Sequence, residues 1–412
     1  MEAKHVMIMG GGIAGMTAAR ELAEFGLTVH LIEKTGFMGG YAIGYTCKAT
    51  TECLQCGACA VEKVLKEVTE TPNIKVHLST TVEAINSENH KFSATLKKDS
   101  TYIDPQKCTN CGICFAQSPE KGAVLRGYSK NNHPLYAVTD AGMQNHREFL
   151  ASICPEGAIS VDAKAATENL DVDAVVVATG FEPFDPDQKP TYGYSKYPNV
   201  ISGLDMERIK RENGQLVRPS DGQTPEKVAF IQCVGSRDER LGHLWCSRVC
   251  CPYALRSAMA VKNKSPEMDI TVFYMDIQNT GKNYTPFYET CKSDFRFIRS
   301  IPVDIWPEAD DCLKLRIVDE AEGTPVMETF DLVVLSIGIM PNSDNQSIST
   351  LLGIELDVDG FLANSKALNQ TLTSKNGIFV AGTASGPNSI AGSMAQAGQA
   401  AGEVLKYLGV TK

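Results

Sequence analysis

The 412-residue chain lacks several features that are typical of nucleic-acid-binding and membrane proteins. It has no run of Lys or Arg, and 49 acidic against 39 basic side chains give a net charge of −10. This balance disfavours nucleic acid and anionic lipid as partners. No apolar stretch approaches the roughly 20 residues that a membrane helix needs. A strand pattern begins within about five residues of Met1, which leaves no room for a signal peptide and predicts a cytoplasmic protein.

Cysteine, in contrast, is abundant, with 14 residues. In a long chain without an export signal, clustered cysteines indicate metal or redox chemistry before structural disulfides. Twelve of them form three groups: a first group of Cys47, Cys53, Cys56 and Cys59, a second of Cys108, Cys111, Cys114 and Cys154, and a third of Cys233, Cys246, Cys250 and Cys251. The other two, Cys291 and Cys312, are expected to be free buried thiols.

The N-terminal segment carries the pattern of a dinucleotide-binding unit. A strand is predicted at 5–9, followed by a G-x-G-x-x-G turn, a helix and a second strand at 27–32. Glycines in such a turn let backbone N–H groups approach a pyrophosphate, and an acidic residue after the second strand can accept hydrogen bonds from a ribose. The residues expected to contact the cofactor here are Gly10, Gly12, Ile13, Ala14, Gly15, Glu33 and Lys34. A glycine turn without function is the alternative.

Later stretches favour FAD over NAD as the dinucleotide. A Gly-Gly pair soon after Glu33 is the pattern of two-domain flavoprotein reductases, and a helix predicted at 391–408 would direct its N-terminal dipole towards the flavin ring. The late segment usually carries Gly-Asp, and Thr383 in place of Asp leaves the ribityl contact open. The further residues expected at the cofactor are Gly39, Gly40, Val82 as a backbone contact to adenine, Ala178, Thr179, Gly180, Gly382 and Thr383.

A second glycine motif is missing where two-domain flavoproteins bind NAD(P)H. After the apolar start of a predicted strand, at 227–231, the turn holds one glycine and a cysteine, so a close approach to a pyrophosphate is not expected. The third cysteine group stands there instead, with the spacing C-x12-C-x3-C-C, which no zinc ribbon shows. Adjacent Cys250 and Cys251 could reach one cluster from a turn or a helix N-terminus. Buried free thiols are the alternative.

The flavin-binding stretches, together with C-x12-C-x3-C-C, resemble the HdrA-like flavin and iron–sulfur subunits of heterodisulfide reductases. Relatives include the A subunit of the quinone-interacting membrane-bound oxidoreductase complex, and the resemblance covers nearly the whole chain. It implies that the third group holds a [4Fe–4S] cluster close to FAD and that NAD(P)H is not bound. It also implies transfer of electrons between FAD and iron–sulfur partners, with bifurcation of electron pairs at the flavin in the methanogen enzymes. The implied partners are HdrB- and HdrC-like subunits, or a membrane quinone-interacting subunit that would bring the chain to a membrane.

The second cysteine group has the pattern of half of a two-cluster ferredoxin. Such a protein carries two copies of C-x2-C-x2-C-x3-C-P, and the fourth Cys of each copy binds the cluster of the other. All four ligands of one cluster are present, whereas the other cluster would need cysteine where Ser118, Gln144, Arg147 and Leu150 stand. We therefore predict one intact [4Fe–4S] site, with a zinc site or a vestigial loop as the alternative.

The first cysteine group, spaced C-x5-C-x2-C-x2-C, leaves more alternatives open. It could bind a third cluster, with or without a ligand from a partner subunit. It could also supply a redox-active dithiol near the flavin, or form a structural thiol patch. The predicted cofactors are thus FAD and two [4Fe–4S] clusters, with a third if this group binds one.

These patterns predict an α/β protein with a two-domain, FAD-dependent, pyridine-nucleotide-disulfide-reductase-like (Rossmann) fold and an inserted ferredoxin-like iron–sulfur segment. The expected divisions are a first FAD-binding part at 1–45, an insertion with FAD-domain strands at 46–165, an FAD-domain continuation at 166–225, a second Rossmann-like domain at 226–335 and a C-terminal FAD-binding part at 336–412. No acid–base constellation stands out, and no catalytic side chain is predicted. The expected function is electron transfer within a heterodisulfide-reductase-like complex. The alternatives are a self-sufficient NAD(P)H-dependent flavoprotein like the glutamate synthase small subunit, and a cluster-bearing scaffold.

Overall fold

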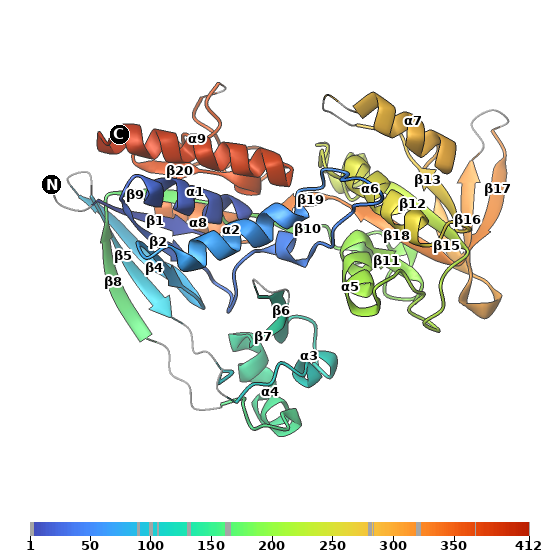
Figure 1. Cartoon of the computed structure of the whole chain (residues 1–412), viewed down its shortest axis with the longest axis horizontal. Coiled ribbons are helices and arrows are strands. Elements are labelled where there is room, and N and C mark those ends of the chain that lie inside the picture. Colours follow the sequence, from blue (N-terminus) through green and yellow to red (C-terminus); the bar gives the residue numbers. More distant parts are fainter. Residues whose placement is uncertain are drawn as a thin grey trace.

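The computed structural model describes residues 4–88, 91–98, 102–104, 107–129, 133–160, 166–278, 282, 284–318, 323–366 and 368–411. Within these residues two five-stranded parallel sheets form the centres of two lobes that lie side by side (Figure 1). The first lobe has the strand order β20 (Ile378–Val380), β9 (Ala174–Val177), β1 (His5–Met9), β2 (Thr28–Ile32), β3 (Ile74–His77). The second lobe has the order β11 (Val200–Ser202), β18 (Leu332–Ile337), β12 (Lys227–Val234), β13 (Asp269–Phe273), β14 (Arg296–Ile298).

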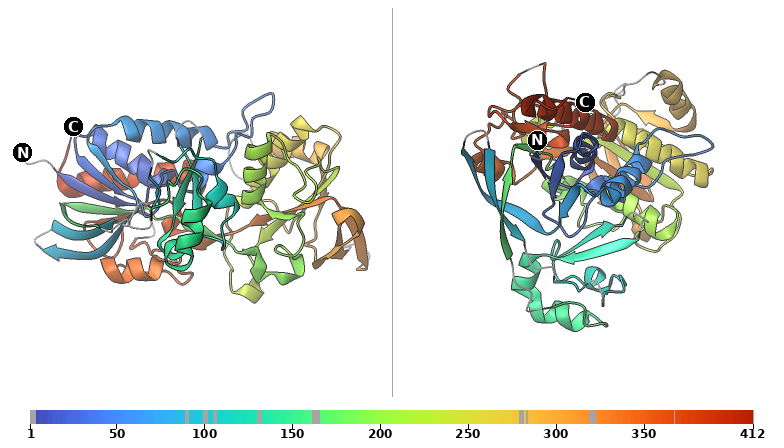
Figure 2. Two further views of the ribbon diagram at one scale, coloured as in Figure 1. Left: turned by 90° about the horizontal axis from the view of Figure 1, so that it is seen from below. Right: turned by 60° about the vertical axis from the view of Figure 1, so that its left-hand side comes forward.

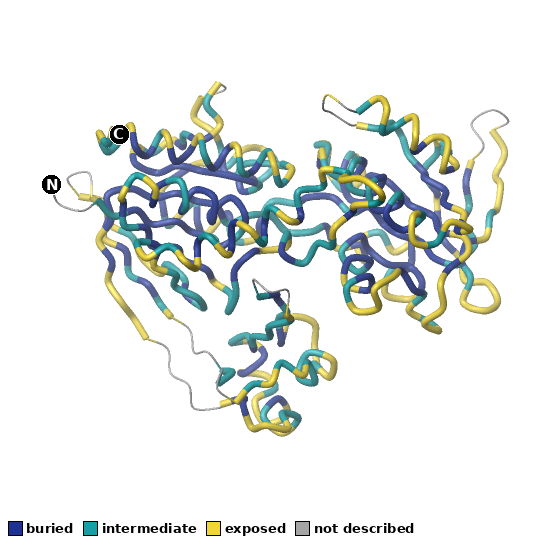
Figure 3. Tube along the Cα trace, in the orientation of Figure 1, coloured by how far each residue is buried: buried dark blue, intermediate teal, exposed yellow. Residues whose placement is uncertain are grey.

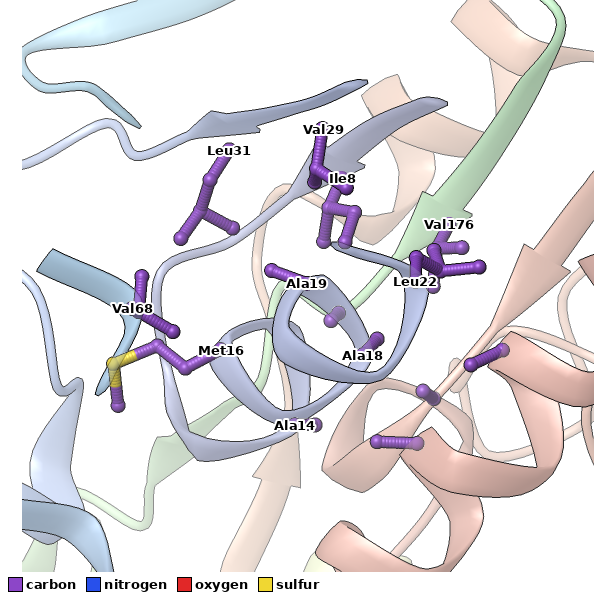
Figure 4. Packing of buried hydrophobic residues seen from close by; sticks show 14 of the residues in the cluster. Ile8, Ala14, Met16, Ala18, Ala19, Leu22, Val29, Leu31, Val68 and Val176 are labelled. Atoms are coloured by element: carbon purple, nitrogen blue, oxygen red, sulfur yellow. The ribbon is translucent and has the colours of Figure 1, made fainter. Parts of the chain in front are cut away.

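The first sheet is covered on both faces, which explains why its strands are almost wholly apolar. One face packs against the helices α1 (Ile13–Glu24), α2 (Ala58–Glu70) and α9 (Ile390–Leu408). Figure 4 shows this cluster, in which Ile8, Val29, Leu31 and Val176 of the strands meet Ala14, Met16, Ala18, Ala19 and Leu22 of α1 and Val68 of α2. The other face packs against the antiparallel strands β4 (Thr80–Glu88), β5 (Lys91–Lys98) and β8 (Ala166–Val172) and against α8 (Asn345–Leu352).

The second sheet is likewise covered on both faces. The helices α5 (Gly203–Asn213), α6 (Cys250–Lys264) and α7 (Tyr284–Asp294) lie on one face. The antiparallel strands β15 (Asp304–Pro307), β16 (Leu313–Val318) and β17 (Pro325–Phe330) contribute to the core of the other. Helix α5 begins with a capping box in which the side chains of Ser202 and Asp205 bond each other's backbone N–H groups. The strand pair β10 (Phe181–Pro183) and β19 (Ile339–Pro341) crosses between the two lobes.

Residues 102–160 form a third, smaller unit, which we call the inserted module. It contains α3 (Ile113–Ala116), the hairpin β6 (Val124–Tyr128) and β7 (Pro134–Val138), and α4 (Asp140–Ile153). The chain leaves the first lobe after β5 and returns to it in β8, which pairs with β5. Seen from below, the module lies across the junction of the two lobes (Figure 2). Its buried core is small, with Val124, Val138, Met143, Leu150 and Ile159 (Figure 3).

The predicted elements of the first lobe agree with the structure: the expected strands at 5–9 and 27–32 and the helix at 391–408 correspond to β1, β2 and α9. In the part of the predicted insertion that precedes the module, α2 and β3–β5 belong to the first lobe. Among the described residues no helix is both long and apolar enough to cross a membrane.

Candidate functional site

A cavity of about 610 Å³ lies where the two lobes and the inserted module meet. It begins at the carboxyl ends of β1 and β9, the edge at which parallel α/β sheets bind their ligands. Twelve of the predicted cofactor residues line it, namely Gly10, Gly12, Ile13, Ala14, Glu33, Lys34, Gly39, Gly40, Ala178, Thr179, Gly180 and Thr383. Gly15, Val82 and Gly382 are not among the lining residues.

The three glycines of the first turn have different structural tasks. A Cβ atom on Gly10 would lie 2.3 Å from the carbonyl oxygen of Ala178, and one on Gly15 would lie 1.9 Å from that of Gly10. These two glycines therefore let the turn and α1 pack closely. A Cβ on Gly12 would meet no protein atom within 4 Å, so Gly12 keeps space open in the cavity itself. Gly382 resembles the packing glycines, because its Cβ would lie 2.6 Å from that of Ala14.

The lining atoms fit a dinucleotide such as FAD. Helix α1 begins without a capping side chain, so the N–H groups of its first turn are available to a pyrophosphate. The Glu33 carboxylate accepts hydrogen bonds from the backbone N–H groups of Gly11 and Thr35, each at 2.7 Å. A carboxylate has about four acceptor positions, so it can also accept from a ribose hydroxyl. The hydroxyl of Thr179 is buried without a hydrogen-bond partner among the described residues.

The turn after β12 differs from a nucleotide-binding turn. Gly235 has a φ of +82°, and a Cβ there would lie 2.0 Å from the ring of Phe184. The ring of His243 hydrogen-bonds the carbonyl oxygen of Gly235 through Nδ1 at 2.8 Å. Cys233 adopts the left-handed conformation, with a φ of +59°, which is rare for residues other than glycine. Protein side chains therefore occupy the space beside the one glycine of this turn.

The third cysteine group converges at this turn and at the start of α6. Cys233 follows the apolar part of β12, whereas Cys250 and Cys251 open α6 and are 4% exposed each. A hydrogen bond with Cys250 lowers the pKa of Cys233, and the same bond together with burial raises the pKa of Cys250. Burial raises the pKa of Cys251 to about 12, and the nearby Cys233 and Cys246 add to the shift. Cys250 also lines the cavity that the first-lobe glycines line.

The second cysteine group surrounds one hollow in the inserted module. A cavity of about 20 Å³ is lined by Cys108, Cys111, Cys114 and Cys154. Cys154 thus lies beside the three others across forty residues of sequence. Burial raises the pKa of the Cys114 thiol, and the three neighbouring thiols raise it further. Leu150, at one of the positions where the second ferredoxin cluster would need cysteine, is wholly buried in the apolar core of the module.

The ligand type and spacing of the second and third groups suit iron–sulfur clusters, which are commonly held by four Cys thiolates. Within the described part of the chain, no three His, Cys, Asp or Glu side chains lie close enough together to hold a single metal ion. A four-iron cluster is wider than one ion, and its ligands stand further apart.

The first cysteine group is not drawn around one hollow. Cys56 lines the large cavity, whereas Cys47, Cys53 and Cys59 are exposed. Cys56 directly precedes Gly57, which caps α2. Of the two isolated cysteines, Cys291 is buried as expected, whereas Cys312 is partly exposed.

The loop that carries this group is bound to the second lobe by polar contacts that the sequence did not predict. Lys48 and Glu207 form an ion pair, with side chains only 2% and 3% exposed, and Lys48 lines the cavity. The Arg256 Nε donates to the carbonyl oxygen of Leu54 at 2.6 Å. Burial lowers the pKa of Lys210 to about 8, although the nearby Glu207 opposes the shift. No motif signals these residues, because their partners are distant in sequence.

Arg126 of the inserted module is a further lining residue that the sequence did not reveal. Its guanidinium pairs with Glu212 of α5 and lies 5.8 Å from the ring centre of Phe115, which follows Cys114. A Cβ on Gly127 would lie 2.2 Å from the ring of Phe37, so the module also packs tightly on the first lobe. The second cysteine group is therefore connected to the cavity through Phe115 and Arg126.

Substitution of the first-turn glycines should separate cofactor binding from folding. Gly12→Ala adds a methyl group that meets only the cavity, so we expect FAD affinity to fall at least about tenfold with Tm changed by less than about 4 °C. Gly15→Ala should lose stability as well, because its Cβ meets the Gly10 carbonyl. Gly398→Ala, in a helix and outside the cavity, is the control. Calorimetric titration of the apoprotein with FAD measures the affinity, and unchanged binding by Gly12→Ala would contradict the assignment.

Loss of Cys154 should empty the second cysteine site as completely as loss of Cys111 does. We expect Cys154→Ser to lose about four irons per chain, because it removes one of four thiolate ligands. Iron and acid-labile sulfide, assayed in anaerobically purified protein, provide the measurement. Cys312→Ser is the control and should keep the wild-type content. A Cys154→Ser protein with full iron content would show that Cys154 is not a ligand.

Comparisons with known proteins agree with this architecture. A family model described as pyridine nucleotide-disulphide oxidoreductase matches residues 4–230, more than half of the chain. Two thioredoxin reductases share the fold: that of T. acidophilum is 12% identical, with a TM-score of 0.53 and 97% of each chain covered. That of Lactococcus lactis is 14% identical, with a TM-score of 0.55 and coverage of 98% of this chain and 99% of the other.

Two curated relatives from methanogens, both HdrA proteins, match nearly the whole chain. One belongs to the "H(2):CoB-CoM heterodisulfide,ferredoxin reductase" of Methanothermobacter thermautotrophicus and is 33% identical over 96% of this chain and 62% of its own length. The other is an iron–sulfur subunit of the "CoB--CoM heterodisulfide reductase" of Methanocaldococcus jannaschii and is 35% identical over 97% of this chain and 64% of its own length. The chain therefore spans less than two thirds of the length of these relatives. The predicted resemblance to HdrA and the predicted reductase fold are confirmed, and the chain belongs to the pyridine nucleotide-disulphide oxidoreductase family.

Proposed function

We propose that this chain is an FAD- and [4Fe–4S]-containing electron-transfer subunit of a heterodisulfide-reductase-like oxidoreductase complex. The observation that carries the proposal is the position of Cys250: it belongs to the third cysteine group and lines the same cavity as the dinucleotide glycines. A cluster held there would lie next to the flavin. FAD supplies the exchange between paired and single electrons, and the clusters carry single electrons.

The protein's own residues bind and insulate these groups. Gly12 and the first turn of α1 would bind the pyrophosphate, and Glu33 the ribose. The side chains of Phe184 and His243 fill the turn beside Gly235 at the place of the NAD(P)H motif. Electrons then enter and leave through protein-bound clusters instead of a nicotinamide.

The inserted module would provide the second cluster, with Cys108, Cys111, Cys114 and Cys154 as ligands. Phe115 and Arg126 connect that site to the cavity wall, and Cys111 is exposed. This module is thus suited to relay electrons between the flavin and a partner protein. The first cysteine group would supply a third cluster only with rearrangement of its exposed loop or with a ligand from a partner, since only Cys56 lines the cavity.

The relatives' names indicate the kind of assembly. They are subunits of heterodisulfide reductases, and one name includes ferredoxin. By analogy, the partners of this chain are HdrB- and HdrC-like subunits in the cytoplasm, or a quinone-interacting subunit that places the complex at a membrane. The flavin then either divides electron pairs between two acceptors or passes them along one chain of clusters.

Reduction of the flavin by different donors tests this function. In anaerobic protein loaded with FAD and iron, we expect NADH and NADPH to leave the flavin absorbance unchanged, because the turn after β12 has no pyrophosphate site. A reduced ferredoxin should bleach the flavin within the same stopped-flow experiment. Cys250→Ser, which keeps the FAD-binding glycines, should retain FAD and lose most of the fast ferredoxin-driven phase. Rapid bleaching by either nicotinamide would contradict the proposal and favour a self-sufficient NAD(P)H-dependent reductase.

A further inference from the structure

Gln232 is a buried amide whose polar atoms have no partner in the described part of the chain. It stands in β12 directly before Cys233 and is 1% exposed. Neither its Oε1 nor its Nε2 has a hydrogen-bond partner there. Nearly all buried side-chain amides in proteins are hydrogen-bonded, so this one requires a partner of another kind.

The alternation of β12 places this amide on the side of α6. Val228 and Phe230 pack in one cluster with Ala254 and Leu255 of α6, whereas Ala229 and Ile231 pack on the opposite face. Because strand side chains alternate, Gln232 belongs to the face that α6 covers.

The first turn of α6 lies at the end of the strand where Gln232 stands. Strands β12 and β13 are parallel, so α6 between them must run back along the sheet. Cys250 and Cys251 in its first turn are therefore near the carboxyl end of β12. Gln232 thus lies beside the cysteines of the third group.

The neighbouring strand gives a second point of reference. In β18, Leu335 pairs with Ile231 and Ile337 pairs with Val234, so Ser336 is level with the region of Gln232. Ser336 lines the large cavity. The amide therefore stands between the third cysteine group and the proposed flavin site.

We propose that the Nε2–H of Gln232 donates a hydrogen bond to a sulfur of the [4Fe–4S] cluster held by the third cysteine group, and thereby raises its reduction potential. The inference rests on the proposed function, because it requires that cluster. Hydrogen bonds to cluster sulfurs stabilise the more negative, reduced state. A neutral amide can do this without adding a charge or a proton to the site. Gln232 is thus a positioning and tuning residue, not a catalytic one.

The test substitutes Gln232→Met, which keeps the length of the side chain and removes the donor. We expect full iron content and a reduction potential of the third-group cluster lowered by about 59 mV, which is a tenfold smaller equilibrium constant for one-electron reduction. A redox titration followed by EPR measures it, and Cys250→Ser identifies which signal belongs to this cluster. Thr271→Val, which removes a buried hydroxyl from the adjacent strand β13, is the control and should leave the potential unchanged.

The possible outcomes separate the two proposals. If Cys250→Ser keeps all wild-type iron and EPR signals, there is no such cluster and the proposed function fails. If the cluster is present and Gln232→Met leaves its potential unchanged, or shifts the flavin potential instead, the inference alone fails. If Gln232→Met loses the cluster, the stability of the iron-free protein decides. A stability at least equal to wild type means that the amide serves the cluster, and a lower one means that it has a structural partner and overturns the inference.

Discussion

A buried ion pair between Lys48 and Glu207 joins the two lobes at the cavity, and the shape of the proposed site depends on it. Both side chains are almost fully enclosed, and the ammonium group also lies 5.3 Å from the ring centre of Tyr253. Burial opposes the ionised form of Glu207, but the charges of Lys48 and Lys210 hold its pKa below the usual value. Loss of one partner would leave a buried charge, at a cost of about 3–5 kcal/mol. The pair fixes the loop of Cys56 against α5, so that first-lobe glycines and second-lobe Cys250 face one cavity.

This closure brings together two kinds of binding element that are chemically distinct. On the first lobe, backbone N–H groups and the Glu33 carboxylate suit a dinucleotide. On the second lobe, the position of a nicotinamide motif is occupied by aromatic side chains and thiols. The fold of a thioredoxin reductase is retained, but the second lobe has lost the glycine turn that a hydride donor needs. An oxidoreductase built in this way is suited to exchange electrons with clusters.

Local patterns in the sequence predicted the first lobe well. The glycine turn of β1 and α1 and the late helix α9 are short-range features, and their residues line the cavity as expected. The counting argument for Cys154 also placed it beside Cys108, because ligand spacing in a two-cluster ferredoxin is regular. Val82 does not line the cavity, since its strand β4 packs behind the first sheet.

Other parts of the site could not be predicted from local patterns. Lys48 meets Glu207 across 159 residues, and Arg126 reaches the cavity only because the module folds back onto α5. Nothing in the spacing of the first cysteine group shows that three of its members are exposed. The orphaned amide of Gln232 is visible only when burial and hydrogen bonding are known atom by atom. Such features depend on tertiary packing, which periodicity and motif spacing do not encode.

The content of iron and acid-labile sulfide per FAD, with EPR of the reduced protein, tests the central claim most directly. The account predicts one FAD per chain with about eight irons if the second and third cysteine groups bind clusters, or about twelve if the first group does so as well. The reduced protein should show signals of more than one interacting [4Fe–4S] cluster. Four irons or fewer per FAD in anaerobically prepared protein would contradict the grouping of the cysteines on which the account rests.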